Sequence, residues 1–470
     1  MDSFIASLKP ERFYLSALDN SMSVINIPLY YWFETTVPSN VLEESFYRAM
    51  EAFPILAGRI KTGNDSRTYV EINKDQLNMP VYTDSSCYVH FQTLKDSDFD
   101  VRLLPVDYSS ASGVSVPPGI FGGCIKLAEF HILRMADDSG MCVFASVSHA
   151  IFDGTGVCAF MNHWATISKC IMEAEGKQGI CDIATLTKHF QHNRSILETD
   201  KNCDTDALDS ELCKAVGKDS SIAKWFAWIS PELRGRLIKY VMPPLDTHIQ
   251  YAHLSSSALD RLLQLIQPFA EPGISHLSAN DVISALVSIL FAQALHKAGR
   301  LDGETHFFAI IAVDWRPRVK RLANMDYVGN ATAPNESSSL LAPMLKERKP
   351  QTLAVVACNI RRTVDKVNEG YCNQLWHLLS KSPCSYVNFT MLLASRKNSN
   401  TLTNFSRMRF YETDFGNGSP VLVRPAFLFT QNLTVIMPGR PGVGGYDIAF
   451  FMDPSIVKKI KESEYWNYLQ

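Results

Sequence analysis

One short segment constrains the fold of this chain more than any other: residues 147–154, with the sequence VSHAIFDG. The apolar stretch that leads into it, residues 141–147, predicts a buried strand, and Gly154 ends that pattern just before a helical spacing begins. His149 is therefore expected at a strand-to-loop junction, where an imidazole with an ordinary pKa of about 6.5 could accept a proton. A simple turn, in which Asp153 only bonds backbone amides, explains the same residues equally well.

Length and composition favour a two-domain globular chain. The 470 residues exceed one ordinary core, and 46% of them are hydrophobic and 20% charged. The net charge of -3, with scattered basic residues, argues against nucleic acid as a partner. The N-terminus lacks signal-peptide features, and the apolar run at residues 283–295 suits a core helix better than a transmembrane segment. Eleven cysteines without Cys-x-x-Cys spacing favour reduced thiols, so we expect a cytoplasmic protein. We also expect a monomer.

Helical and strand patterns alternate along the chain, which predicts an α/β (α+β) fold with mixed sheets. One helix is expected to start at Ser39 as N-cap, and another at Ser278, which with Asp281 resembles a capping box. Helices are predicted at residues 41–53, from 157 onward, and at 257–266, 278–298 and 352–367. Strands are predicted at residues 23–33, 68–72, 141–147, 307–313, 386–392, 421–423, 433–437 and 446–451.

The periodic pattern fades near the middle of the chain, which predicts a crossover linker at residues 186–224. It would separate an N-terminal domain, residues 1–185, from a C-terminal domain, residues 225–470. His189 and His192 lie in this linker, but no further ligand stands at a suitable spacing. No metal site is therefore predicted.

A second polar segment, residues 414–418 with the sequence DFGNG, alone predicts only a loop. Together with His149, Asp153 and Gly154 it resembles the paired HxxxDG and DFGWG signatures of the BAHD acyltransferases. Weaker matches to the family follow in the family's order, at residues 15–19, 53–59, 313–318 and 327–331. The resemblance therefore covers most of the chain.

The resemblance implies two chloramphenicol-acetyltransferase-like mixed-sheet domains, with the active site in a channel between them. It implies an acyltransferase that moves an acyl group, with acetyl favoured, from acyl-CoA to a hydroxyl of a small-molecule, secondary-metabolite acceptor. Acyl-CoA would be a co-substrate and no cofactor would be bound permanently. An N-acyltransferase on an amine and a catalytically inactive ligand-binding relative remain alternatives. A condensation domain of peptide synthesis is disfavoured because Ser148 stands where those domains carry a first His.

Roles for the first motif also follow from the resemblance. His149 would be the general base of a direct transfer without an acyl-enzyme. Asp153 would turn away from the imidazole and pair with an arginine, which by position is Arg316. Gly154 would supply a backbone conformation that a side chain hinders.

The second motif, Asp414-Phe415-Gly416, would shape the loop of the second domain and the coenzyme channel. Thr403 is the candidate for an oxyanion or acceptor contact, and the sequence identifies no residue that contacts coenzyme A. Asn417 replaces the tryptophan of DFGWG, and Phe405 stands in a segment where the family has Thr-Ser-Trp. These departures resemble fungal members similar to trichothecene acetyltransferases.

Overall fold

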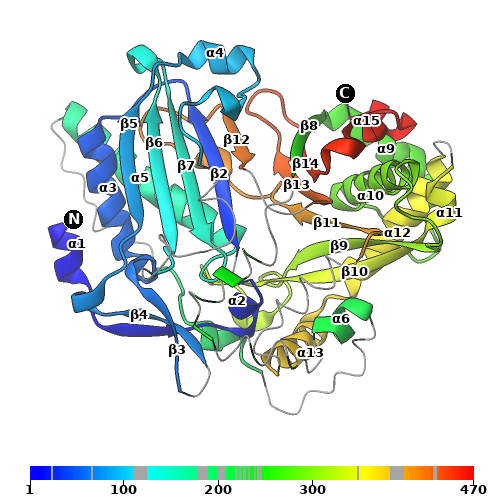
Figure 1. The fold of residues 1–470 in the computed structure, drawn as a ribbon, viewed down its shortest axis with the longest axis horizontal. Helices are drawn as coiled ribbons and strands as arrows, with labels where there is room; N and C mark the ends of the chain where they lie inside the picture. The colour runs from blue at the N-terminus through cyan, green and yellow to red at the C-terminus, as the bar shows by residue number, and fades with distance from the viewer. Residues whose placement is uncertain are drawn as a thin grey trace.

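Two units, each built from a sheet and helices, lie side by side in a computed structural model of the chain (Figure 1). The structure describes residues 1–22, 25–64, 67–108, 124–177, 189–199, 246–346, 349–381, 396–426 and 431–469, with scattered residues between 208 and 240. The prediction of an α/β fold with two mixed-sheet units is confirmed.

The first unit contains a five-stranded sheet with the strand order β12-β2-β7-β6-β5. Its central pair is antiparallel and joins β2 (Asn26–Phe33) to β7 (Met141–Ser148), whose residues are all buried. Helices α3 (Ser39–Glu51) and α5 (Gly154–Lys177) pack together and share a core with this sheet. Because the apolar residues of β7 are covered on both faces, the strand reads as one continuous hydrophobic run. The other strands are β5 (Val81–Ser86), β6 (Ala128–Arg134) and β12 (Leu422–Pro425).

A small three-stranded sheet with the order β1-β4-β3 completes the first unit. Its strands are β1 (Glu11–Tyr14), β3 (Arg59–Thr62) and β4 (Thr68–Ile72).

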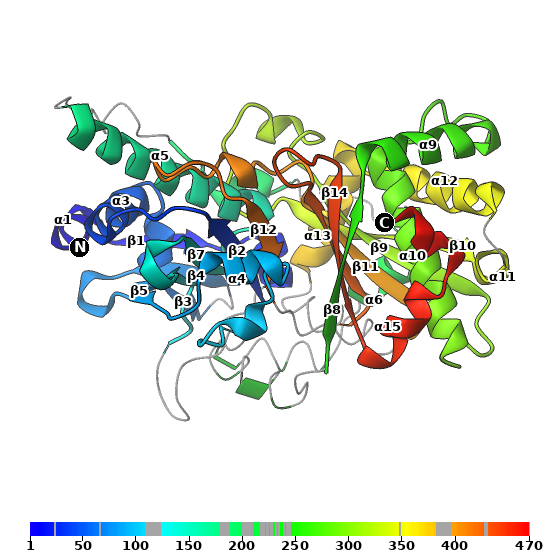
Figure 2. The same ribbon diagram turned by 90° about the horizontal axis from the view of Figure 1, so that it is seen from above.

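The second unit contains a six-stranded sheet with the order β10-β9-β11-β13-β14-β8. Figure 2 shows α9, α10 and α12 on the side of this sheet that faces away from the first unit. Side chains of β13 and β14 on the opposite face, such as Val435 and Phe451, belong to the core of the first unit. The strands are β8 (His248–Leu254), β9 (His306–Asp314), β10 (Thr332–Leu340), β11 (Ser399–Asn404), β13 (Leu433–Pro438) and β14 (Tyr446–Met452).

Helix α10 (Ala279–Lys297) is the central helix of the second unit. The predicted capping box at its start is confirmed, because Ser278 and Asp281 exchange side chain-to-backbone bonds. In the described part of the chain, α10 is the one helix apolar and long enough to cross a membrane, and 83% of that stretch is buried inside the protein. The remaining helices are α1 (Asp2–Ser7), α2 (Ala17–Ser21), α4 (Phe91–Asp96), α6 (Glu211–Val216), α9 (Ser256–Ile266), α11 (Leu341–Met344), α12 (Pro350–Lys366), α13 (Glu369–Ser380) and α15 (Pro454–Lys461).

The chain crosses back to the first unit near its C-terminus. Strand β12 pairs antiparallel with β2, so Val423 lies opposite Tyr31 in the first sheet. The expected domain ranges, 1–185 and 225–470, place β12 in the second domain. In the structure this strand, which follows the DFGNG segment, belongs to the first sheet. A short apolar run such as β12 carries no sequence signal for which of two sheets it joins.

Several boundaries differ from the predictions. Pro38, rather than Ser39, is the N-cap of α3. Helix α5 begins at Gly154, before the apolar spacing that starts at Val157, because Asp153 accepts the first free amides of the helix. The predicted strand at residues 386–392 lies outside the described residues.

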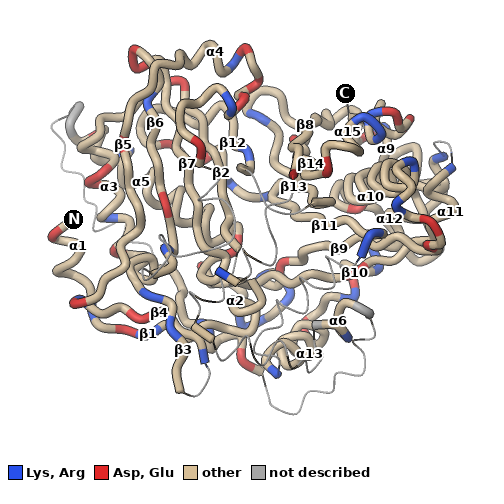
Figure 3. Tube along the Cα trace, in the orientation of Figure 1, with Lys and Arg blue, Asp and Glu red and all other residues tan. Residues whose placement is uncertain are grey.

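The cysteines and charges show two further features. Seven described cysteines form no disulfide, whereas Cys170 is disulfide-bonded, so the expectation of reduced thiols fails at that position. In Figure 3, basic and acidic residues are interspersed over both units in the described part of the chain.

Candidate active site

His149 follows the last residue of β7, as its position in the sequence predicts. The backbone on both sides of its Cα is fixed, because its N–H donates to the Ile25 carbonyl at 2.8 Å and its carbonyl accepts from Asn330 Nδ2 at 2.8 Å. The ring is half-buried, and its Nδ1 is enclosed without a hydrogen-bond partner among the described residues.

Burial lowers the pKa of His149 below its ordinary value, because a desolvated imidazolium is disfavoured. The carboxylate of Asp153 opposes this effect by favouring the charged form, and the net direction remains downward. His149 is therefore neutral at neutral pH, which is the state in which an imidazole accepts a proton.

Asp153 is buried, with 2% of its side chain exposed. Its carboxylate accepts two hydrogen bonds from Arg316, at 2.9 and 3.0 Å, and one from the backbone N–H of Ala331 at 3.0 Å. It also accepts the amides of Thr155 and Gly156, each at 3.1 Å, and so caps α5. In the described part of the chain no hydrogen bond joins it to the His149 ring. The arrangement therefore differs from a hydrolase triad, in which the carboxylate bonds the base.

Arg316 comes from the segment after β9 in the second unit and uses its full set of donors. Besides Asp153 it bonds the carboxylate of Asp314 at 3.0 Å and the carbonyls of Tyr327 and Gly329 at 3.0 and 2.8 Å. Burial alone would lower the pKa of Arg316, but the two carboxylates outweigh it and raise that pKa. The pair that the family resemblance implied between Asp153 and Arg316 is thus present, and it joins the two units.

Gly154 lies where another segment approaches the backbone closely. A Cβ atom there would stand 2.6 Å from Cε1 of Phe405 and 2.8 Å from Cε of Met408, closer than real Cβ contacts. Its φ is not in the left-handed region, because Gly154 is the first residue of α5. A side chain at Gly154 would thus be hindered by residues that follow β11, and not by a left-handed backbone.

The DFGNG segment lies against α5 of the first unit. The side chain of Phe415 is fully buried and packs edge-on against Trp164, with ring centroids 4.8 Å apart. Asp414 accepts the amides of Gly416 and Gly418 and pairs with Lys169 at 2.6 Å. The loop is thus fixed by its own turn and by one helix.

Asn417 belongs to the DFGNG segment, and Thr403 belongs to β11. Asn417 exchanges hydrogen bonds with the backbone and side chain of Thr35, at 2.7 and 2.8 Å. Thr403 is half-buried in β11, opposite Val435 of β13, two residues before the Phe405 that meets Gly154.

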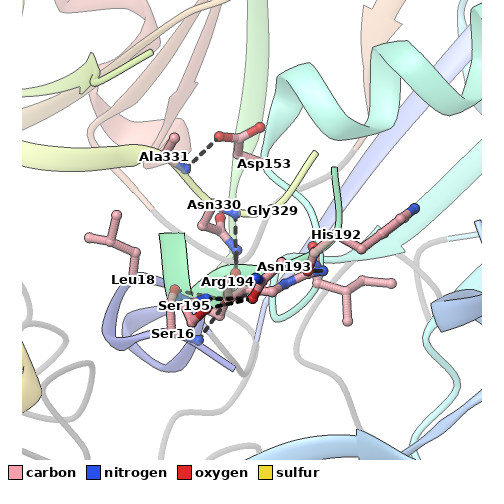
Figure 4. A network of polar contacts seen from close by, with 12 residues as sticks. Ser16, Leu18, Asp153, His192, Asn193, Arg194, Ser195, Gly329, Asn330 and Ala331 are labelled. Atoms are coloured by element: carbon pink, nitrogen blue, oxygen red, sulfur yellow. Dashed lines mark hydrogen bonds and ion pairs between the residues drawn. The ribbon is translucent and has the colours of Figure 1, made fainter. Parts of the chain in front are cut away.

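Sequence reasoning missed a buried polar cluster on the other side of His149, defined by Ser16, Asp19, Arg194 and Asn330 (Figure 4). Asp19 is fully buried and caps α2 through Ser16, while Arg194 lies 3.6 Å from it. Three of these residues could have been found, because Ser16, Asp19 and Asn330 lie in the segments at 15–19 and 327–331 that resemble the family. The resemblance gave them no role. Arg194 had no such signal, because it stands in a segment without periodicity.

The sequence matches the Transferase family over residues 6–188 and 245–466. The chain is 22% identical over 450 residues to hydroxycinnamoyl-CoA:piscidic acid hydroxycinnamoyltransferase of Actaea racemosa, with 91% of this chain and 90% of that protein covered. It is 26% identical over 238 residues to hydroxycinnamoyltransferase 2 of Oryza sativa subsp. japonica, where the match spans 50% of this chain and about half, 51%, of that protein.

The fold matches those of solved structures over nearly its full length. TRI101 of F. graminearum, crystallised with coenzyme A and deoxynivalenol, has a TM-score of 0.73 at 15% identity, covering 98% of this chain and 99% of that one. Vinorine synthase has a TM-score of 0.57 at 14% identity, covering 96% and 92%. The family match, the two-unit fold and the histidine loop agree: the chain belongs to the Transferase family of BAHD acyltransferases and is an acyl-CoA-dependent acyltransferase.

Proposed function

We propose that this enzyme transfers an acyl group, with acetyl favoured, from acyl-CoA to a hydroxyl group of a small secondary metabolite, and that His149 is the general base. The observation that carries the proposal is the state of His149. Its pKa is lowered, and the nearby carboxylate of Asp153 is occupied by Arg316 instead of the imidazole.

The reaction needs one proton acceptor and no covalent enzyme intermediate. Nε2 of His149 takes the proton of the acceptor hydroxyl while that oxygen attacks the thioester carbonyl. The tetrahedral intermediate then collapses, the C–S bond breaks, and the coenzyme thiolate takes the proton back from the imidazolium. The products are an ester and the free thiol of coenzyme A. General-base assistance of this kind contributes about a hundred- to ten-thousand-fold in rate.

Other residues of the two motifs serve the same site in this proposal. The Asp153–Arg316 pair holds the histidine loop, and Gly154 lets the segment after β11 approach it. Thr403 in that strand is the proposed oxyanion or acceptor contact. Asp414-Phe415-Gly416 shapes one wall of the coenzyme channel, which the packing of Phe415 on α5 supports. We also propose a cytoplasmic monomer; a dimer by size-exclusion chromatography would contradict the second part.

The test is coenzyme release from acetyl-CoA with a panel of hydroxylated terpenoids, alkaloids and polyketides, followed by mass spectrometry of the products. The His149→Ala variant is expected to lose at least about a hundred-fold in kcat. His377→Ala is the matched control, because His377 is a buried histidine of α13 in the second unit. Turnover that survives in His149→Ala refutes the assigned base, and products acylated only on nitrogen refute the hydroxyl acceptor. An enzyme that binds acyl-CoA but transfers to no acceptor would favour the ligand-binding alternative.

A further inference from the structure

The side chain of Asn330 lies between a buried carboxylate and the backbone of His149. Its Nδ2 donates to Asp19 Oδ1 at 2.7 Å and to the His149 carbonyl at 2.8 Å, and its own backbone N–H donates to the same Oδ1 at 3.1 Å. The side chain of Asn330 is 1% exposed. A single amide therefore connects the catalytic strand end to a carboxylate that has no access to water.

The carboxylate of Asp19 is itself held on every side. Ser16 donates to Oδ2 with its backbone N–H and its hydroxyl, both at 2.8 Å. Arg194 lies 3.6 Å from the same oxygen, with its side chain 2% exposed, and its Nη2 donates to the Ile151 carbonyl at 2.6 Å. Figure 4 shows Ser16, Arg194 and Asn330 converging from three separate parts of the chain. This cluster thus donates hydrogen bonds to two carbonyls of the histidine loop, those of residues 149 and 151.

We propose that Asn330 is a positioning residue for His149, which transmits the rigidity of the buried Asp19–Arg194 pair to the backbone that carries the imidazole. The inference rests on the proposed function, because it assumes that the position of His149 limits the rate.

The physical reason lies in how the ring is held. No carboxylate of the described residues bonds the imidazole, and its Nδ1 is enclosed without a close hydrogen-bond partner; the Asn330 side chain acts on the ring only by raising its pKa slightly against the effect of burial. The orientation of the ring then depends on packing, on Asn330 and on the backbone, which is held by Ile25 on one side and by Asn330 on the other. Reacting groups displaced by about 1 Å can cost about a hundred-fold in rate, so a loosened carbonyl at position 149 should affect catalysis directly.

The decisive variant is Asn330→Ala, with Asn398→Ala as its matched control. Asn398 is also buried, and its Nδ2 also bridges a carboxylate and a main-chain carbonyl, those of Glu304 at 2.8 Å and His306 at 2.9 Å. It stands before β11 and makes no contact with the histidine loop that the structure describes. Both variants lose the same kind of bridge, but Asp19 is fully buried and Glu304 is exposed, so Asn330→Ala should lose more stability and kcat is compared per folded enzyme.

The expected difference is in catalysis. Asn330→Ala should lower kcat by about tenfold or more, with the KM for acyl-CoA changed by less than about twofold, while Asn398→Ala keeps the wild-type kcat. An unchanged kcat in folded Asn330→Ala, or an equal loss in both variants, overturns the inference. Asn330→Leu, which keeps the volume, loses the amide donor and adds no charge beside Asp19, serves if the alanine variant does not fold. If neither Asn330 variant folds, the Asn330 amide is required for stability, and the positioning role is overturned.

The proposed function is tested separately in the same assay. If His149→Ala retains turnover, the proposed base is wrong whatever Asn330 does. If His149→Ala is inactive and Asn330→Ala is fully active, only the positioning role falls.

Discussion

Arg316 of the second unit holds Asp153 of the first through two parallel hydrogen bonds, of 2.9 and 3.0 Å between guanidinium and carboxylate. The carboxylate is 2% and the guanidinium side chain 13% exposed, so neither charge can exchange its partner for water. The pair therefore fixes the C-terminal end of the histidine loop to the segment that follows β9. Breaking this contact is therefore expected to affect both the stability of the protein and the position of the histidine loop.

Removing one partner of this pair should damage both properties. Asp153→Ala leaves the Arg316 charge buried and is expected to lower the free energy of unfolding by about 3 to 5 kcal/mol, together with kcat. The control is Asp84→Ala, which breaks a similar two-bond pair with Arg134, at 2.8 Å for each bond, at the edge of the first sheet. That variant should lose stability without a loss of kcat per folded enzyme. Denaturant titration and steady-state kinetics measure the two effects; an unchanged melting temperature of Asp153→Ala would contradict this account.

Gly154 should not tolerate a side chain. In Gly154→Ala the new Cβ would press on the side chains of Phe405 and Met408, which must shift, and a loss of about 1 to 3 kcal/mol is expected. Gly370→Ala is the control because Gly370 also lies in the first turn of a helix, α13, and a Cβ there meets only Asn368 Oδ1 at 3.3 Å. Thermal melting of both variants decides the point. Equal stability of the two would show that the close approach at Gly154 is not a constraint.

If His149 is the base, as proposed, the pH dependence of the reaction follows from its lowered pKa. A general base must be neutral, so kcat/KM should rise with pH as the imidazolium of the free enzyme loses its proton, and then reach a plateau. Because burial lowers this pKa, the midpoint should lie below the ordinary value of about 6.5. Initial rates from about pH 4.5 to 8 measure it. A midpoint above the ordinary value would mean that the carboxylate of Asp153, rather than burial, dominates.

The turn of the DFGNG segment offers a comparison of two glycines. Gly416 and Gly418 have φ angles of +102° and +91°, which favour glycine at both positions. A Cβ at Gly416 would also stand 3.0 Å from Met172 Cγ, whereas nothing lies within 4 Å at Gly418. Gly416→Ala should therefore destabilise the protein more than Gly418→Ala, by up to about 1 kcal/mol beyond the shared backbone strain of about 1 to 2 kcal/mol. Melting temperatures in the opposite order would refute the proposed packing on α5.

Sequence patterns identified several of the elements whose burial is one-sided or complete, although β6, whose burial alternates, was not predicted. Strand β7 and helix α10 are apolar along their length and were predicted within one or two residues. Strand β10 was not predicted, because its sequence, TAPNESSSL, contains few apolar residues. Its place beside β9 comes from main-chain pairing. Local periodicity carries no information about such pairing.

The candidate site shows the same division. His149 and Asp153 stand in one motif, and the family resemblance pointed from Asp153 to Arg316. No local pattern could show that Asp19, Arg194 and Asn330 meet, because they are separated by more than a hundred residues and gather only when the two units pack. Likewise, the neighbours of Gly154 come from residues 405–408, so only the tertiary contact explains why that position has no side chain.

His192 provides a stability prediction that is independent of catalysis. It is half-buried, its Nε2 bonds the Ala52 carbonyl at 2.8 Å, and its ring meets Phe53 edge-on at 5.6 Å between centroids. Burial, helped by the charge of Arg194, lowers the pKa of His192 to about 4. The unfolded chain, with a pKa of about 6.5, therefore binds this proton more readily than the folded protein does.

The sign of the effect follows directly. Above about pH 6.5 neither state is protonated at this position, and the contribution is constant; as the pH falls toward about 4 the unfolded state gains a proton first, so stability falls. A separation of this size corresponds to about 3 kcal/mol across the window. His192→Asn, which cannot titrate, should flatten the difference in unfolding free energy between about pH 6.5 and 4 relative to wild type. Denaturant titrations at each end measure it, and parallel losses of stability in the two proteins would exclude His192 as the source.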